Sequence, residues 1–227
     1  MQVSPVVRTA VSDVVFASLV DEILSGRTEP GQAIPSEREL AVAFGVNRHA
    51  VREALKRVQQ AGLVAISQGG KTRVQDWRRY AGLDVLVALT TSGAVPAKTL
   101  IHDIAVMRAS LGADAARWCA RNATDEELAA VVSAAAAFPA GAVAPAELIA
   151  IDLTFWEAVI DGSHNVAYRL GLNTLVAGLV EMGYEHVEGL FDEQADRDAH
   201  VQLAQLIADR DEQGARALAE RLMSPKE

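Results

Sequence analysis

Five basic side chains lie on one face of the segment that follows Asn47 in this 227-residue chain: Arg48, His49, Arg52, Lys56 and Arg57. The opposite face is apolar, with residues at i, i+3, i+4 and i+7: Val51, Ala54, Leu55 and Val58. Arginine can donate two hydrogen bonds to O6 and N7 of guanine, or to a phosphate. A helix of this kind can read DNA, although most charged helix faces are only solvated surface.

The segment before this helix helps to decide between the two interpretations. Ser36 and Glu39 have the spacing of a capping box, which predicts that an earlier helix begins at Ser36. We expect its apolar face to consist of three residues: Leu40, Ala43 and Phe44. Gly45 then ends it, and Asn47 caps the basic helix. Two short helices joined by a tight turn are typical of a helix-turn-helix.

A glycine hairpin follows the basic helix. Gly62 ends that helix, and residues 64–66 and 72–74 have the composition of short strands around a Gln-Gly-Gly-Lys tip at 68–71. Upstream, apolar residues at helical spacing between Val11 and Leu24 predict a supporting helix. Three helices followed by a hairpin predict a winged helix-turn-helix, which inserts a helix into the major groove. Lys71 and Arg73 add a second basic element, which favours DNA binding over a merely solvated face.

The stretch from Pro30 to Val64 resembles the GntR family of bacterial transcription regulators. It carries Pro-Gly-x-x-Ile-Pro-Ser-Glu-Arg-Glu-Leu-Ala, then Phe-Gly-Val-x-Arg-x-x-Val-Arg-Glu-Ala-Leu-Lys-Arg, then Gly-Leu-Val. Residues 70–74 and 81–86 are similar to the FadR subfamily. The resemblance implies that the wing tip enters the minor groove, and the expected DNA contacts are Arg38, Asn47, Arg48, His49, Arg52, Gln68, Gly69, Gly70 and Lys71. Asn47 and His49 replace the hydroxyl and small residues that are commoner there, which affects the base preference.

Charge divides the chain into two parts. Residues 1–79 contain 11 Lys and Arg against 8 Asp and Glu, whereas residues 80–227 contain 10 against 22. We therefore expect the DNA-binding domain at 1–76, a linker with a helix at 77–96, and a second domain at 97–227 that faces away from DNA. The single cysteine, Cys119, excludes a disulfide framework and indicates a reducing cytoplasm, and the N-terminal sequence lacks the apolar core of a signal peptide.

The second domain is expected to be entirely helical, so that the whole chain is mainly α. Apolar residues at helical spacing predict helices near 82–91, 97–121, 125–137, 146–160, 165–189, 193–209 and 211–223. Thr124 and Glu127 form another capping box. Six to seven such helices make an antiparallel bundle, and bundles build ligand sites from inward-facing side chains.

This bundle resembles the FCD domain, the C-terminal ligand-binding domain of FadR-type regulators. Many FCD domains hold a metal with an aspartate, a histidine four residues later and two further histidines. Here Asp152 and His200 match, but Trp156 and Leu222 stand at the other two places. No metal and no cofactor are therefore expected. Without the metal ligands, the domain is more similar to that of FadR proteins that sense fatty acyl thioesters. The effector-binding residues that this resemblance implies are Arg108, Asp152, Trp156, Tyr168, Asn173, Tyr184 and His200. For Trp156 and Tyr168, an ordinary place as core aromatics is the somewhat stronger interpretation.

These observations predict a ligand-responsive transcription regulator. It would bind a near-palindromic operator as a homodimer and act as a repressor, released by a fatty acyl-CoA, a fatty acid or another carboxylate. Two alternatives stay open: a metal-dependent sensor of small organic acids, and a constitutive DNA-binding protein whose bundle only dimerises. An enzyme is not expected, because the sequence has no phosphate-binding glycine loop, nucleophile elbow or complete metal set.

Overall fold

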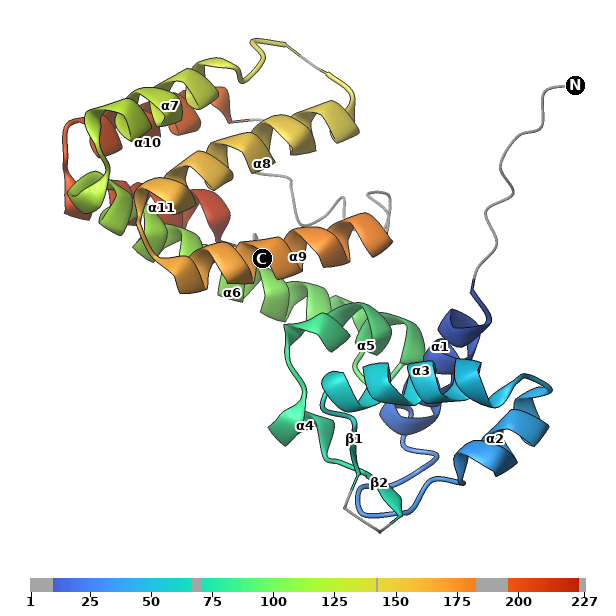
Figure 1. Cartoon of the computed structure of the whole chain (residues 1–227). Coiled ribbons are helices and arrows are strands. Elements are labelled where there is room, and N and C mark those ends of the chain that lie inside the picture. Colours follow the sequence, from blue (N-terminus) through green and yellow to red (C-terminus); the bar gives the residue numbers. More distant parts are fainter. Residues whose placement is uncertain (1–9, 67–70, 142, 183–195, 225–227) are drawn as a thin grey trace, which may run out of the picture. The chain divides into compact units, whose positions relative to one another are not determined.

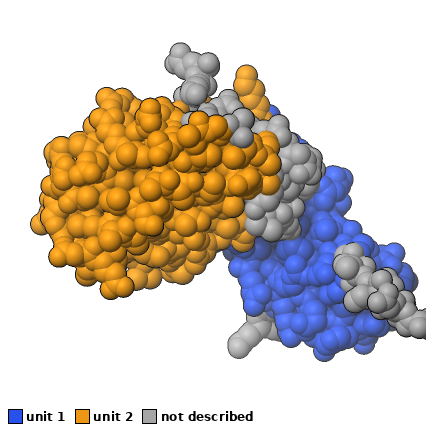
Figure 2. All heavy atoms as spheres, turned by 90° about the horizontal axis from the view of Figure 1, so that it is seen from above, with its two compact units in different colours: residues 1–97 blue, residues 98–227 orange. Residues whose placement is uncertain are grey.

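The computed structural model describes residues 10–66, 71–141, 143–182 and 196–224. The chain forms two compact units, unit 1 at 1–97 and unit 2 at 98–227, which Figure 2 shows in different colours. The described residues are mainly helical and include one small two-stranded sheet, which confirms the predicted fold class. No helix among them is long and apolar enough to cross a membrane.

Unit 1 is built around three helices, α1 (Val11–Leu24), α2 (Glu37–Phe44) and α3 (Arg48–Gln60). Helix α3 packs against both α1 and α2 (Figure 1). The buried side of α3 is the predicted apolar stripe, joined by one alanine: Ala50, Val51, Ala54, Leu55 and Val58. Burial of this stripe leaves the basic side chains of α3 on the exposed side of the helix.

The predicted helix ends are confirmed. The Ser36 hydroxyl accepts a hydrogen bond from the Glu39 N–H, and the Glu39 carboxylate accepts one from the Ser36 N–H. Gly45 ends α2 in the left-handed region with φ of 65°, and Asn47 Oδ1 accepts a hydrogen bond from the N–H of Ala50. Because each signal is local, the cap residues alone predict where the turn between the two helices begins and ends.

The predicted apolar face of α2 is only partly correct. Leu40 and Ala41 are buried, whereas Ala43 and Phe44 are exposed. Helix α2 has eight residues and packs mainly on α3, so it buries one narrow stripe in its middle turn. Phe44, in the last turn, lies outside that stripe.

The wing consists of β1 (Val64–Ile66) and β2 (Thr72–Val74), which pair antiparallel with Val64 opposite Val74. A third segment lies along the other edge of β2. The Ile34 N–H donates to the Thr72 carbonyl at 3.0 Å, and the Val74 N–H donates to the Gln32 carbonyl at 2.9 Å. Residues 31–34, which lead into α2, are therefore hydrogen-bonded to the wing.

Gly62 is held by a close backbone approach. It has φ of +74°, and a Cβ atom there would lie 2.1 Å from the carbonyl oxygen of Tyr80. Tyr80 ends α4 (Trp77–Tyr80), which is followed by the short 3₁₀ helix η1 (Leu83–Val85) and by α5 (Leu86–Ser92), which packs against α1. The segment expected as a linker, 77–96, thus contains three short helical elements and falls within unit 1.

Unit 2 contains six helices in its described residues: α6 (Ala97–Asn122), α7 (Asp125–Ala136), α8 (Pro145–Gly162), α9 (Val166–Met182), α10 (Arg197–Ala208) and α11 (Glu212–Met223). Helix α7 packs against α8 and α10, α10 packs against α11, and α8 packs against α9. The Thr124–Glu127 capping box that begins α7 is confirmed. The parts of the predicted helices that fall at 183–195 lie outside the described residues.

Candidate DNA-binding surface and effector site

The predicted DNA contacts of unit 1 lie on its surface. Six of them are exposed, and we call this set the reading surface: Arg38, Asn47, Arg48, His49, Arg52 and Lys71. Arg48, His49 and Arg52 occupy the first two turns of α3, the end of a recognition helix that meets base edges. Gln68, Gly69 and Gly70 lie outside the described residues. Asn47 uses Oδ1 to cap α3, so its amide nitrogen takes no part in this cap and is the remaining donor of the side chain.

Basic residues of α3 form ion pairs with three different partners. Arg52 meets Glu37 of α2, with Nη2 at 2.8 Å from Oε2, and Lys56 meets Glu53 at 2.9 Å. Arg57 pairs with Asp13 of α1 at 2.5 Å, and its guanidinium lies 4.1 Å from the centre of a ring of α1, that of Phe16. Arg57 therefore contributes contacts that hold α3 against α1. The sequence did not point to Glu37, because nothing in its spacing predicts a contact with Arg52.

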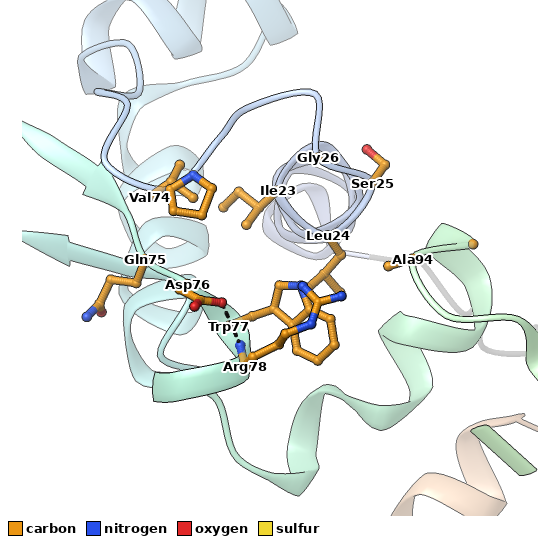
Figure 3. A pocket seen from close by; sticks show the side chains of 12 residues that line it. Ile23, Leu24, Ser25, Gly26, Val74, Gln75, Asp76, Trp77, Arg78 and Ala94 are labelled. Carbon is orange, nitrogen blue, oxygen red and sulfur yellow. Dashed lines mark hydrogen bonds between the residues drawn. The ribbon is translucent and has the colours of Figure 1, made fainter. Parts of the chain in front are cut away.

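Unit 1 also contains a cavity of about 360 Å³. It is lined by the end of α1, by the residues that follow β2, by α4 and by Gly93 and Ala94. Figure 3 shows the Trp77 indole and the Arg78 guanidinium lying together beside Leu24; the guanidinium is 4.3 Å from the ring centroid. None of the predicted DNA-binding or effector-binding residues lines this cavity.

Two predicted effector residues of unit 2 meet in its interior. Asp152 of α8 and His200 of α10 are almost wholly buried, and His200 Nε2 lies 3.4 Å from Asp152 Oδ1. His200 Nδ1 lies 2.8 Å from the carbonyl oxygen of Asp196. Since a carbonyl only accepts, Nδ1 carries the hydrogen, and Nε2 has no hydrogen-bond partner among the described residues.

Aromatic rings enclose this pair. Phe138 stacks on the His200 ring at 4.0 Å between centroids, and Phe155 meets it edge-on at 5.2 Å. We call these four residues, Asp152, His200, Phe138 and Phe155, the buried polar cluster. Its two polar side chains thus lie in largely apolar surroundings.

The donor set at this place does not fit a metal ion. Trp156, one turn after Asp152, is buried, and its Cζ3 atom would lie 3.2 Å from a Cβ added at Gly112. Leu222 is also buried in the apolar core. Among the described residues, no group of three or more His, Cys, Asp and Glu side chains could hold a metal. A structural metal site usually needs four ligands, so two donors are too few.

Tyr168 belongs to a different cluster. Its hydroxyl donates to Asp114 of α6 at 2.5 Å, and Asp114 also accepts from Arg117 Nε and Trp118 Nε1. Burial alone would raise the pKa of Asp114, but the hydrogen bonds from Tyr168, Arg117 and Trp118 outweigh it and lower that pKa. The same bond to Asp114 raises the pKa of Tyr168. The i, i+3, i+4 spacing of the three α6 residues was a local signal that could have identified Asp114.

The other effector candidates are scattered. Arg108 is half-buried on α6 and Asn173 is exposed on α9. Tyr184 lies outside the described residues. Of the seven predicted effector residues, the structure therefore brings Asp152 and His200 into contact, with Trp156 one helical turn from Asp152, and places Tyr168 in a separate cluster with Asp114.

A winged helix-turn-helix with an exposed basic α3, followed by a helical unit, defines a DNA-binding transcription regulator. Residues 11–74 match the family profile "Bacterial regulatory proteins, gntR family", and residues 103–224 match the FCD domain. The chain belongs to the GntR family and carries an FCD effector-binding domain. Members of this family are DNA-binding regulators and not enzymes, which confirms that expectation.

Two relatives illustrate the resemblance. The HTH-type transcriptional regulator Mce2R of Mycobacterium tuberculosis (strain CDC 1551 / Oshkosh) is 37% identical over 183 residues, which cover 78% of this chain and 73% of that protein. The fatty acid metabolism regulator protein of Vibrio cholerae is 33% identical over 93 residues, which cover 41% of this chain and 33% of that protein.

A solved structure shows the fold alone. The chain is similar to Lar, a protein that controls expression of the agr system of Listeria monocytogenes, with a TM-score of 0.56 and 17% sequence identity. The match covers 96% of this chain and 94% of that one.

Proposed function

We propose that the chain is a ligand-responsive repressor that binds a near-palindromic operator as a homodimer. The observation that carries this proposal is α3, whose buried stripe fixes the helix while Arg48, His49 and Arg52 stay exposed in its first two turns. Two copies of such a helix would reach successive major-groove faces of one operator. Residues 1–79 have a net charge of only +3, from 11 basic and 8 acidic side chains, so a single copy would bind weakly.

The proposed DNA contacts are the reading surface together with the wing tip at 68–70. The proposed domain division is DNA-binding residues 1–76, a linker at 77–96 and the effector-binding and dimerising part at 97–227. Arg48 is the best single test of the contacts. It is exposed, and for it the structure gives no hydrogen bond or salt bridge to a described residue. Its replacement therefore breaks no hydrogen bond or salt bridge that the structure gives between described residues.

DNA binding is tested by selecting duplexes from a random pool and measuring gel retardation over a range of salt. The change Arg48→Ala is expected to weaken operator binding by about 1–3 kcal/mol. Arg216→Ala, which removes an exposed arginine from α11, is the matched control and is expected to leave operator binding unchanged. A wild-type protein that selects no sequence and shows no salt-sensitive retardation would contradict the proposal.

The proposed effector is a fatty acyl-CoA, a fatty acid or another carboxylate. The two aromatic rings of the buried polar cluster and the incomplete set of metal ligands both favour an organic ligand held without a metal ion. The relative from Vibrio cholerae is named as a regulator of fatty acid metabolism, which agrees with this class. Arg108 is the proposed partner of the carboxylate or carbonyl group.

Thermal unfolding with a series of acyl-CoA esters, free fatty acids and small organic acids tests the effector. A ligand at 100 times its dissociation constant stabilises the folded protein by about 2.7 kcal/mol. The same ligand is expected to lower operator affinity in the gel assay. The absence of any shift across the series would favour a bundle that only dimerises.

A further inference from the structure

Glu37 lies on the same exposed side of unit 1 as the basic residues of α3, although it is acidic. It is the first residue of α2, directly after the Ser36 cap. Its carboxylate accepts hydrogen bonds from two nitrogens of Arg52. Nε donates to Oε1 at 3.1 Å, and Nη2 donates to Oε2 at 2.8 Å. The pair spans the turn between the two helices and fixes the position of Arg52 relative to α2.

The charge of Glu37 is well defined. The hydrogen bond from Arg52 lowers the pKa of Glu37, and the nearby charges of Arg48 and Lys56 lower it further. Glu37 is therefore ionised at neutral pH. An exposed carboxylate there would repel DNA phosphates, and an exposed pair of this kind contributes only about 0.2–1 kcal/mol to stability. Stability alone is thus a weak reason for an acidic residue at this place.

The geometry of the pair leaves one side of the guanidinium available. Arginine has five N–H donors in a rigid plane, and Glu37 takes the edge formed by Nε and Nη2. The outer edge, with the two terminal nitrogens, matches O6 and N7 of guanine. A side chain held in one orientation before binding loses less conformational entropy when it meets its target. Arg52 is held in this way, whereas among the described residues the structure gives Arg48 no hydrogen bond or salt bridge.

We propose that Glu37 is a positioning residue that aims Arg52 at a guanine of the operator, so that it sets sequence specificity rather than overall DNA affinity. This inference rests on the proposed function of the chain as an operator-binding regulator. The chain offers a matched control in Glu53, which pairs with Lys56 inside α3 at 2.9 Å. Lys56 is a point charge on a flexible stem and has no second edge to be oriented. Glu53→Gln removes the same charge as Glu37→Gln.

The experiment compares the wild-type chain, Glu37→Gln and Glu53→Gln. Each is titrated with a duplex that the wild type selected from a random pool, and with a scrambled duplex of the same length and composition. The measured quantity is the ratio of the two dissociation constants. Glu37→Gln is expected to lower this ratio about tenfold, since one bidentate guanine contact discriminates by about that factor or more. Glu53→Gln is expected to leave the ratio unchanged.

Two further arms separate orientation from charge or folding. In the Arg52→Ala background, Glu37→Gln is expected to cause no further loss of specificity, because the residue that it aims is gone. Replacing single operator guanines by 7-deazaguanine is expected to reveal one position in each half-site at which the wild type loses affinity and Glu37→Gln does not. Thermal unfolding checks that Glu37→Gln is as folded as Glu53→Gln.

Two outcomes would overturn the proposal. Glu37→Gln could keep the wild-type ratio, or it could tighten binding to both duplexes equally, which would make Glu37 only a repulsive charge. Failure of the wild type to select any sequence is a different result, because it would remove the proposed function on which this inference rests.

Discussion

In unit 1 the side chains of Arg52 and Glu37 meet at 54% and 37% exposure, whereas in unit 2 those of His200 and Asp152 meet at 1% and 2%. The first pair is open to solvent, so the outer edge of the Arg52 guanidinium stays open to DNA while Glu37 holds the other edge. The second pair has no such open edge, because both of its side chains lie in an apolar interior, where an unsatisfied polar group is costly. The exposed pair therefore suits binding, and the buried pair specifies how the helices pack.

The same contrast holds for aromatic neighbours. In unit 1 the exposed guanidinium of Arg57 lies over the ring of Phe16, which is only partly buried. In unit 2 the rings of Phe138 and Phe155 close over His200 on two sides. The variants below test how sharply the two regions differ, in order of expected effect.

The largest effect is expected from His200→Leu. It leaves Asp152 buried without the imidazole, and breaking a buried pair in this way costs about 3–5 kcal/mol. Urea unfolding followed by far-UV circular dichroism measures the change. His102→Leu, on the exposed face of α6, is the control and is expected to change stability little. The double variant His200→Leu and Asp152→Leu, which removes both partners, is expected to cost less stability than His200→Leu alone. Equal stability of His200→Leu and the wild type would show that the pair is unimportant.

Gly62→Ala is expected to be the next largest. Its Cβ would collide with the Tyr80 carbonyl, and its positive φ adds strain, so we expect a loss of about 3 kcal/mol. Gly45→Ala has a similar positive φ, but nothing within 4 Å of its Cβ, and is expected to cost about 1 kcal/mol. Thermal unfolding of the two variants separates the cost of the positive φ, which both share, from the cost of the collision with Tyr80, which only Gly62→Ala has. Equal losses would mean that α4 yields readily to the added methyl group.

Tyr168→Phe is expected to have a smaller effect, about 1 kcal/mol at neutral pH, because it removes a hydrogen bond to a partly exposed carboxylate. The pKa of Asp114 is lower in the folded state than in the unfolded state. The stability that this gives is present above the unfolded pKa of about 3.9 and is lost as the pH falls. The gap between Tyr168→Phe and the wild type should therefore narrow in acid. Tyr80→Phe, at an exposed tyrosine, serves as the control, and a gap that widens in acid would contradict the interpretation.

The last prediction concerns the reactivity of the native thiol of Cys119, for which the smallest effect is expected. Burial, followed by the charge of Glu127, raises the pKa of the thiol to about 12. Because the thiolate is the reactive form, the native protein is expected not to react with a thiol reagent at neutral pH, and the unfolded protein to react fully. Rapid labelling of the native chain would show that the interior of unit 2 opens more readily than its packing indicates.

Local signals predicted much of unit 1. The Ser36–Glu39 box, Gly45 and Asn47 each act within four residues, so their effect on α2 and α3 could be inferred from the sequence. Contacts between distant residues could not. Spacing does not show that Glu37 meets Arg52, or that residues 31–34 hydrogen-bond to β2. The narrow buried stripe of α2, which includes Ala41 and omits Phe44, also depends on where α3 lies.

In unit 2 the sequence predicted helices better than the site. Helical spacing identified the described helices within a few residues, because burial of one face imposes that period. The site required knowledge of which inward side chains meet. Asp152 and His200 are 48 positions apart and could be paired only through the FCD resemblance, whereas Asn173 proved to be exposed and Asp114 was not identified.

The hydrogen bonds between residues 31–34 and β2 also bear on how unit 1 folds. These hydrogen bonds close a loop of chain that contains both α2 and α3. The loop can close only when β2 is in place. Closing a loop of this length costs conformational entropy before the contacts repay it. The wing and the helix-turn-helix are therefore expected to form in one cooperative step, with the helices unable to complete their folding before the hairpin is made.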